Sequence, residues 1–184
     1  MHLGWLQTPK KHVLGIFIDL SKAFDTISHE KLLVKLNNYG VRGNVNNLLH
    51  SYLSSRKQYT TFHNEKSDFG FVKYGVPQGS VLGPLLFLIY INDISRASNL
   101  GHFVIFADDS NIFVSADNKA DAYKMANEVM KSVHLYLLSN QLHINTSKCV
   151  YMYFRPNLNN QERLTCARSK PYNREFNLHV NGKK

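Results

Sequence analysis

Two adjacent aspartates, Asp108 and Asp109, stand between two apolar runs of the sequence. The runs cover residues 103–107 and 110–114, and they predict two antiparallel strands with the aspartates in the tight turn between them. Adjacent carboxylates repel each other, so a purely structural turn gains little from having two. A divalent cation removes the repulsion, and hard oxygen ligands suit Mg²⁺ or Mn²⁺. The pair therefore indicates a metal site, with a solvated Asp-Asp turn as the alternative.

A third carboxylate, Asp19, stands near the end of a separate apolar run. Residues 13–20 read Val-Leu-Gly-Ile-Phe-Ile-Asp-Leu, which predicts a strand that is buried on both faces. A carboxylate beside a core is costly unless it meets a cation or a hydrogen-bond donor, and strand ends commonly carry sites. Asp19 is therefore a candidate for the same site, with a plain turn residue as the alternative.

A glycine-rich loop, residues 75–84, reads Gly-Val-Pro-Gln-Gly-Ser-Val-Leu-Gly-Pro and precedes a very apolar helix expected at about 81–94. Ser80 is the expected N-cap, and Pro84 is tolerated because it lies near the helix start. Free backbone N–H groups at such a start suit a phosphate or a nucleotide edge, although shape alone is a weak signal. The helix is apolar almost all round, so we expect it to be buried against a sheet.

The remaining periodicity predicts elements that form the core. A helix begins after an N-cap at Ser28 and stops at Gly40, and a second helix covers about 44–54. Short strands at 58–63 and 69–74 flank a polar turn at 64–67, and a strand covers 149–154. Asp117 or Asn118 caps a long helix that runs to about residue 140. The expected buried faces are Val45, Leu48, Leu49, Tyr52 and Leu53 in the second helix, and Tyr123, Ala126, Val129, Met130, Val133 and Leu137 in the long one.

Composition favours a polyanionic partner. The chain has 184 residues, a formal net charge of +9 and a pI near 9.5, which suits nucleic acid or an anionic membrane surface. Cys149 and Cys166 have no CxxC spacing, so we expect a reducing compartment. No apolar run reaches the ~20 residues of a membrane span, and the N-terminus lacks the character of a signal peptide. We therefore expect an intracellular protein of the nucleus or cytoplasm that is neither secreted nor membrane-bound.

Three motifs together resemble a known family. Residues 17–25 (Phe-Ile-Asp-Leu-Ser-Lys-Ala-Phe-Asp), 75–84 and 106–109 (Phe-Ala-Asp-Asp) occur in the order of palm motifs A, B and C of reverse transcriptases. The variant is similar to the non-LTR (LINE-type, jockey-like) retrotransposon enzymes, and the resemblance spans about 13–154. It implies an α+β fold, namely a polymerase palm with an antiparallel sheet and helices packed on one face. The implied function is RNA-directed DNA polymerase, which transfers dNTP units onto a primer 3′-hydroxyl.

The resemblance also implies roles for the acids. Asp19 and Asp108 would hold two Mg²⁺ ions, with Mn²⁺ as the alternative ion and the backbone carbonyl of Leu20 as a further ligand. Asp109 would support the carboxylate beside it. Lys148 matches the motif D lysine that protonates pyrophosphate, although a lysine before a strand is more often a surface residue.

Further positions match the nucleotide and nucleic-acid contacts of the family. Phe24 matches the residue that stacks under the sugar and rejects a 2′-hydroxyl, and Asp25 would cap or anchor its loop. Gln78 and Gly79 match the loop that contacts the incoming nucleotide and the template. The expected nucleic-acid contacts are Pro77, Ser80, Arg56 and Lys57, although an exposed basic turn is the default for the last two.

The resemblance predicts three segments and a set of partners. Residues 1–12 read as a remnant of the fingers or a linker, 13–154 as the palm with motifs A to D, and 155–184 as a basic loop and an incomplete hairpin leading to a missing motif E. The expected partners are an RNA template, a DNA primer, dNTP and a protein that supplies the missing subdomains. Because fingers and thumb are absent from this interpretation, independent activity does not follow from ancestry. The alternative is a non-catalytic, nucleic-acid-binding remnant of a retrotransposon; another palm polymerase or a cyclase fits the Pro-Gln-Gly loop less well.

Overall fold

The structure is a computed structural model that describes residues 11–54, 56–106 and 109–154. The chain divides into two compact units. The first contains the described residues of 1–21, 94–138 and 143–184, and the second contains those of 22–93 and 139–142. The predicted segments at 1–12 and 155–184 lie outside the described residues, apart from residues 11 and 12.

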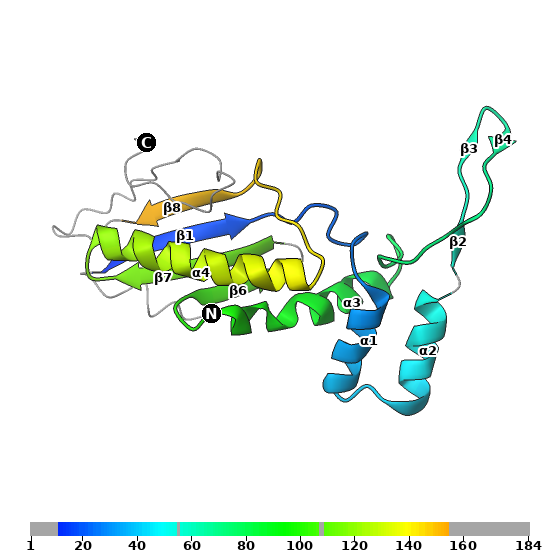
Figure 1. Ribbon diagram of the computed structural model, residues 1–184, viewed down its shortest axis with the longest axis horizontal. Coiled ribbons are helices and arrows are strands. Elements are labelled where there is room, and N and C mark those ends of the chain that lie inside the picture. The colour runs from blue at the N-terminus through cyan, green and yellow to red at the C-terminus, as the bar shows by residue number, and fades with distance from the viewer. Residues whose placement is uncertain (1–10, 55, 107–108, 155–184) are drawn as a thin grey trace. The chain divides into compact units, whose positions relative to one another are not determined.

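An antiparallel sheet forms the centre of the first unit (Figure 1). Its strands are β6 (His102–Phe106), β7 (Asp109–Ala116), β1 (His12–Ile18) and β8 (Val150–Phe154), in the spatial order β6-β7-β1-β8. β1 pairs with β7 on one side and β8 on the other. Leu14 and Ile16 on one face and Val13 on the other are buried, and burial of side chains from both faces accounts for the continuous apolar run. The predicted strand is confirmed, although it ends at Ile18 and leaves Asp19 just beyond it.

Helix α4 (Lys119–Ser139) covers one face of this sheet (Figure 1). The Asn118 side chain accepts a hydrogen bond from the Asp121 backbone N–H at 2.9 Å, so it provides the predicted cap. All six residues of the predicted buried face are buried, and Ala122 joins them. Full burial of each large aliphatic side chain stabilises the fold by about 1.5–3 kcal/mol. The sheet and this helix confirm the predicted α+β class.

The second unit contains α1 (His29–Asn38), α2 (Gly43–Leu53) and α3 (Leu82–Ile91), which the 3-10 helix η2 (Asn92–Ala97) follows. The Ser28 hydroxyl accepts from the Lys31 backbone N–H at 3.4 Å, which confirms the predicted N-cap of α1. Two predicted apolar faces are wrong in part. On α2 Val45 and Leu48 are exposed, and on α3 one side is exposed at Leu85 and Leu88, as is Val81 just before the helix. Periodicity marks which side of a helix is apolar, but it does not reveal whether a partner covers that side.

The segment between α2 and α3 is a hairpin of two short ladders. In one, β2 (Lys57–Gln58) pairs with β5 (Gly70–Phe71), and in the other, β3 (Thr61–Phe62) pairs with β4 (Glu65–Lys66). The predicted hairpin is confirmed, but the turn is His63-Asn64 and not 64–67. Both turn residues have positive φ, 45° and 65°, as the central residues of a type I′ turn require.

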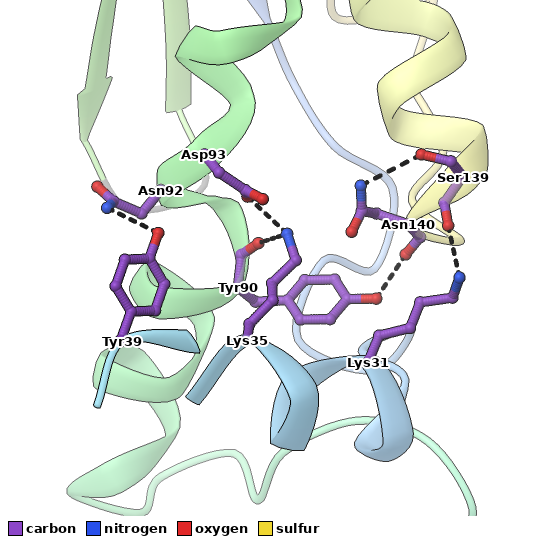
Figure 2. Close-up of polar contacts among 8 residues, drawn as sticks. All are labelled: Lys31, Lys35, Tyr39, Tyr90, Asn92, Asp93, Ser139 and Asn140. Carbon is purple, nitrogen blue, oxygen red and sulfur yellow. Dashed lines mark hydrogen bonds and ion pairs between the residues drawn. The ribbon is translucent and has the colours of Figure 1, made fainter. Parts of the chain in front are cut away.

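Polar contacts hold the end of α4 and residue 140 within the second unit (Figure 2). The Lys31 ammonium donates to the Ser139 carbonyl at 2.7 Å, and the Tyr90 hydroxyl donates to the Asn140 carbonyl at 2.7 Å. Carbonyls at a helix end have no partner in their own helix, so these two donors satisfy them. Tyr90 is fully buried, and burial raises the pKa of its hydroxyl to about 12.

A largely buried ion pair lies beside this contact. The Lys35 ammonium donates to the Tyr90 carbonyl at 2.7 Å and to Asp93 at 2.5 Å (Figure 2). Burial lowers the pKa of Lys35, and the Asp93 carboxylate opposes that shift. The pair therefore links α1 to the junction of α3 and η2. No helix among the described residues is long and apolar enough to cross a membrane.

Candidate active site

Asp19 and Asp109 are the residues directly beyond the last pair of the β1–β7 ladder. That ladder pairs Ile18 with Ser110, and both of these residues are buried. Because successive side chains of a strand alternate between faces, Asp19 and Asp109 belong to the opposite face. Asp109 is exposed and Asp19 is partly exposed. The register therefore brings two of the three predicted carboxylates to one face of the sheet.

The tip of the aspartate hairpin differs in one respect from the prediction. β6 and β7 are antiparallel as expected, and Phe106 pairs with Asp109. Asp109 is therefore the first residue of β7 and does not lie in the turn. Asp108 lies outside the described residues. Within the described ranges, no three acidic, histidine or cysteine side chains gather as a metal-binding group.

A turn before β8 holds Asp19 through its backbone and its side chain. The Asn145 N–H donates to the Asp19 carbonyl at 2.8 Å. The Lys148 ammonium lies 3.5 Å from Oδ2 of Asp19, and the side chains are 69% and 27% exposed, respectively. The Sγ of Cys149 accepts from the Asp19 N–H at 3.4 Å. The structure thus places Lys148, a predicted site residue, next to the predicted metal ligand.

The Cys149 thiol is a feature of the site that the sequence did not reveal. It is buried, and burial raises its pKa, so the group stays a neutral thiol near pH 7. It can also donate back to the Asp19 carbonyl, 3.8 Å away. Position 149 is 130 residues from Asp19, and no spacing rule connects them.

Leu20 continues the chain from Asp19 in an isolated antiparallel bridge with Ile144. The bonds around this bridge belong to the neighbouring residues, such as Ser21 N–H to His143 carbonyl at 2.8 Å. In a pair of this kind, the peptide groups of the central residue point away from the bridge partner. The Leu20 carbonyl is therefore oriented away from Ile144, as a carbonyl must be if it is to bind a ligand beside Asp19.

In the second unit, the Pro-Gln-Gly loop is bonded to the loop that follows Asp19. The Gly75 N–H donates to the Ile27 carbonyl and the Val76 N–H to the Phe24 carbonyl, each at 2.8 Å. Gly75 has φ +83°, and a Cβ there would lie 2.9 Å from backbone atoms of Phe24 and Asp25. Only glycine permits this approach. The His29 ring nitrogen adds a contact to the Gly75 carbonyl at 2.7 Å, which the sequence did not predict.

A side-chain bond extends this connection. The Gln78 amide donates to the Asp25 carboxylate at 2.8 Å. This bond anchors the loop of Asp25, which is one of the two roles predicted for that residue. The Ser80 hydroxyl donates to the Pro77 carbonyl at 2.7 Å and accepts from the Gly83 N–H at 3.0 Å. Ser80 therefore serves the first turn of α3, although the helix proper begins after Val81.

The other predicted contact residues also belong to the second unit. The Phe24 ring packs against the buried Phe87 ring of α3, with centroids 4.9 Å apart. Gly79 has φ +78° and open space around the position of a Cβ. Arg56 lines a hollow of about 550 Å³ that extends to Gln78. The Lys57 ammonium lies 5.2 Å from the centroid of the Phe71 ring.

The fold is that of a polymerase palm, and the chain belongs to the reverse transcriptase (RNA-dependent DNA polymerase) family, which it matches over residues 3–177. It is 28% identical over 152 residues to the RNA-directed DNA polymerase from mobile element jockey of Drosophila funebris, covering 79% of this chain and 16% of that protein. It is 38% identical over 104 residues to the probable RNA-directed DNA polymerase from transposon X-element of Drosophila melanogaster, covering 54% and 11% respectively. The chain thus spans about a sixth or less of these relatives.

Solved structures show the same fold at low sequence identity. Apo telomerase from Candida tropicalis, truncated from its C-terminal domain, matches with a TM-score of 0.57 and 16% identity over 86% of this chain and 35% of that one. Telomerase from the same species in complex with a fragment of telomeric RNA matches with a TM-score of 0.59 and 14% identity over 90% of this chain and 31% of that one.

The sequence relatives from mobile element jockey and transposon X-element confirm the jockey-like, non-LTR resemblance.

Proposed function

We propose that this chain forms the catalytic palm of an RNA-directed DNA polymerase and extends a DNA primer with dNTP along an RNA template. The observation that supports the proposal most directly is the register of β1 against β7. The ladder ends with Ile18 paired to Ser110, and continuing this register by one residue would put Asp19 and Asp109 opposite each other on one face. Family membership supplies the reaction class, and the net charge of +9 suits a nucleic-acid partner.

The chemistry of the donor groups fits divalent metal ions. Asp19 and Asp108 would provide carboxylate oxygens and Leu20 its backbone carbonyl, and these hard oxygens suit Mg²⁺ or Mn²⁺. The Lys148 ammonium beside Asp19 indicates that positive charge is favoured at this carboxylate. Two such ions would polarise the primer 3′-hydroxyl and neutralise the triphosphate and its leaving pyrophosphate.

The chain's own residues would orient the reactants. The Asn145 N–H donates to the Asp19 carbonyl and the Asp19 N–H donates to Cys149 Sγ, so the backbone that carries this carboxylate is fixed before substrate arrives. Lys148 has a largely exposed ammonium, which could give a proton to the leaving pyrophosphate. Asp109 would support the carboxylate of Asp108.

The second unit would select and align the nucleotide. Phe24, which packs against the Phe87 ring, would contact the sugar and reject a 2′-hydroxyl. Gln78, held by Asp25, and Gly79 would meet the incoming nucleotide and its template base. The nucleic acid would be contacted nearby by Pro77, Ser80, Arg56 and Lys57. A protein partner would provide further contacts to the primer.

Mn²⁺ binding tests the proposal without requiring turnover. Isothermal titration would compare the unchanged chain with Asp19→Asn and Asp108→Asn. The control is Asp117→Asn, whose carboxylate is 86% exposed and pairs with Lys11 at 3.1 Å. We expect the first two variants to bind Mn²⁺ at least tenfold more weakly and the control to match the unchanged chain. Equal binding by all four proteins would refute the metal site.

Primer extension on an RNA template then tests the reaction. The substrates are an RNA template with an annealed DNA primer, dNTP and Mg²⁺ or Mn²⁺. Incorporation that disappears in Asp108→Asn and persists in Asp117→Asn would support a polymerase. Metal and RNA binding without incorporation would instead favour the non-catalytic nucleic-acid-binding function.

A further inference from the structure

One face of the β2–β5 hairpin combines exposed aromatic rings with lysines. The side chains concerned are Lys57, Tyr59, Lys66, Phe69 and Phe71, which we call the aromatic face. Tyr59, Phe69 and Phe71 are 47%, 65% and 64% exposed. Exposed rings gathered in this way usually mark a binding surface.

The strand register brings these side chains together. Lys57 stands opposite Phe71, and its ammonium lies 5.2 Å from the centre of that ring. The Tyr59 and Phe69 rings meet edge to face, with centroids 5.3 Å apart. The Lys66 ammonium lies 5.4 Å from the centre of the Tyr59 ring. Since alternate residues of a strand share a face, Lys57 and Tyr59 lie together, as do Phe69 and Phe71.

The return strand of the hairpin has one extra residue between the two ladders. Lys57 pairs with Phe71, but Thr61 pairs with Lys66, so the return strand has one more residue between the ladders. The Ser67 N–H donates to the Thr60 carbonyl at 2.9 Å within this interval. Such an extra residue re-aims the side chains around it, and here it lets both Lys66 and Phe69 meet Tyr59.

Charge on the hairpin favours an anionic partner. Residues 56–74 contain four Lys or Arg and two Asp or Glu. Glu65 pairs with Phe62, and strand alternation assigns both to the opposite face. The aromatic face therefore presents two ammonium groups around three rings.

The base of the hairpin opens onto a path toward the predicted nucleotide loop. A hollow of about 550 Å³ is lined by Phe71 of the aromatic face, by Arg56 and Lys73, and by Pro77 and Gln78. Its two cations suit a phosphodiester backbone, while its one carboxylate, Asp25, accepts from the Gln78 amide. A strand lying on the aromatic face could thus continue to Gln78 within the second unit.

We propose that the aromatic face binds the unpaired RNA template by stacking bases on Tyr59, Phe69 and Phe71, while Lys57 and Lys66 meet its phosphates. Base stacking on aromatic rings, combined with cations along the backbone, is how proteins bind single strands without reading their sequence. The choice of RNA rests on the proposed function, in which the template is RNA and is unpaired before it is copied.

Fluorescence anisotropy with a labelled, unstructured 12-nucleotide RNA tests this inference on the full chain without metal or dNTP. The variant is Phe69→Ala/Phe71→Ala. The matched control is Phe62→Ala, which removes a ring that is 73% exposed on the opposite face. We expect the double variant to raise the Kd about tenfold or more, and the control to stay within twofold of the unchanged chain. A duplex RNA arm should show no change, because paired bases cannot stack on the rings.

Charge removal gives a second readout. In Lys57→Gln/Lys66→Gln, the slope of log affinity against log salt should fall in magnitude by about 1.4, since each phosphate contact with a single strand contributes about 0.7. The inference is overturned if the unchanged chain does not bind the single strand, if the double ring variant binds as tightly as the unchanged chain, or if Phe62→Ala weakens binding equally. The proposed function could survive those results, because Mn²⁺ binding at Asp19 is measured separately.

Discussion

Replacing Gly75 by alanine tests whether the Pro-Gln-Gly loop and the loop after Asp19 form one rigid connection. At φ +83°, a non-glycine residue costs about 1–2 kcal/mol. The added Cβ would also lie 2.9 Å from three backbone atoms of Phe24 and Asp25, which cannot rotate away. Crowding of this kind costs about 1–3 kcal/mol. We therefore expect the free energy of unfolding to fall by about 2–5 kcal/mol.

Gly40→Ala is the matched control for this prediction. Gly40 has a similar φ of +89°, but nothing lies within 4 Å of the position of its Cβ. Only the conformational term applies, so the expected loss is about 1–2 kcal/mol. Urea unfolding measures both losses, and for a chain of this length each 1 kcal/mol also lowers Tm by roughly 2–4 °C.

Comparison of the two variants decides the point. A larger loss for Gly75→Ala would show that the loops are pressed together, as the bonds from Gly75 to Ile27 and from Val76 to Phe24 indicate. Equal losses would refute the reasoning, because the crowding would then be absent or relieved by an easy shift of the loop.

Two further predictions concern Tyr90 and Lys148. Tyr90→Phe removes the bond to the Asn140 carbonyl and should lower the free energy of unfolding by about 1–3 kcal/mol at pH 7. The pKa of Tyr90 is raised from 10 to about 12, so its neutral form adds stability below pH 10 that is lost as pH rises to 12. Urea unfolding of Tyr90→Phe at alkaline pH should lack this part of the loss. Identical pH profiles for the variant and the unchanged chain would contradict the assignment. Lys148→Met removes the cation beside Asp19 and should strengthen Mn²⁺ binding roughly two- to fivefold. Titration calorimetry measures this, and weaker binding would show that Lys148 does not compete with the metal.

The sequence pattern predicted correctly those elements that depend on residues close together in the chain. The cap at Ser28 depends on a residue three positions away, and the buried face of α4 follows its helical period. β1 was recognisable because a strand whose two faces are both largely buried reads as a nearly continuous apolar run. By contrast, the exposed Leu48 and Leu85 show that an apolar stripe does not disclose what covers it.

The sequence singled out the acids of the candidate site but not the contacts that support them. Asp19 and Asp109 stood out because carboxylates beside apolar strands are costly without a cation. The thiol of Cys149 acts across 130 residues and the Gln78–Asp25 bond across 53, and no periodicity encodes such pairings. The turn at His63-Asn64 was missed because positive φ at two non-glycine residues is uncommon.

The order in which the sheet's strands occur along the chain bears on how the protein is made. β1 is the first of the described strands, yet its Val13 pairs with Phe154 and with Ser115. During synthesis, β1 must therefore wait with both edges unpaired until its partners in β7 and β8 have emerged from the ribosome. Contacts so distant along the chain slow folding, and unpaired strand edges invite aggregation in the interval. Asp19 gains its contact with Cys149 only after 130 further residues have been made, so the backbone of this predicted metal ligand stays unsupported during that interval.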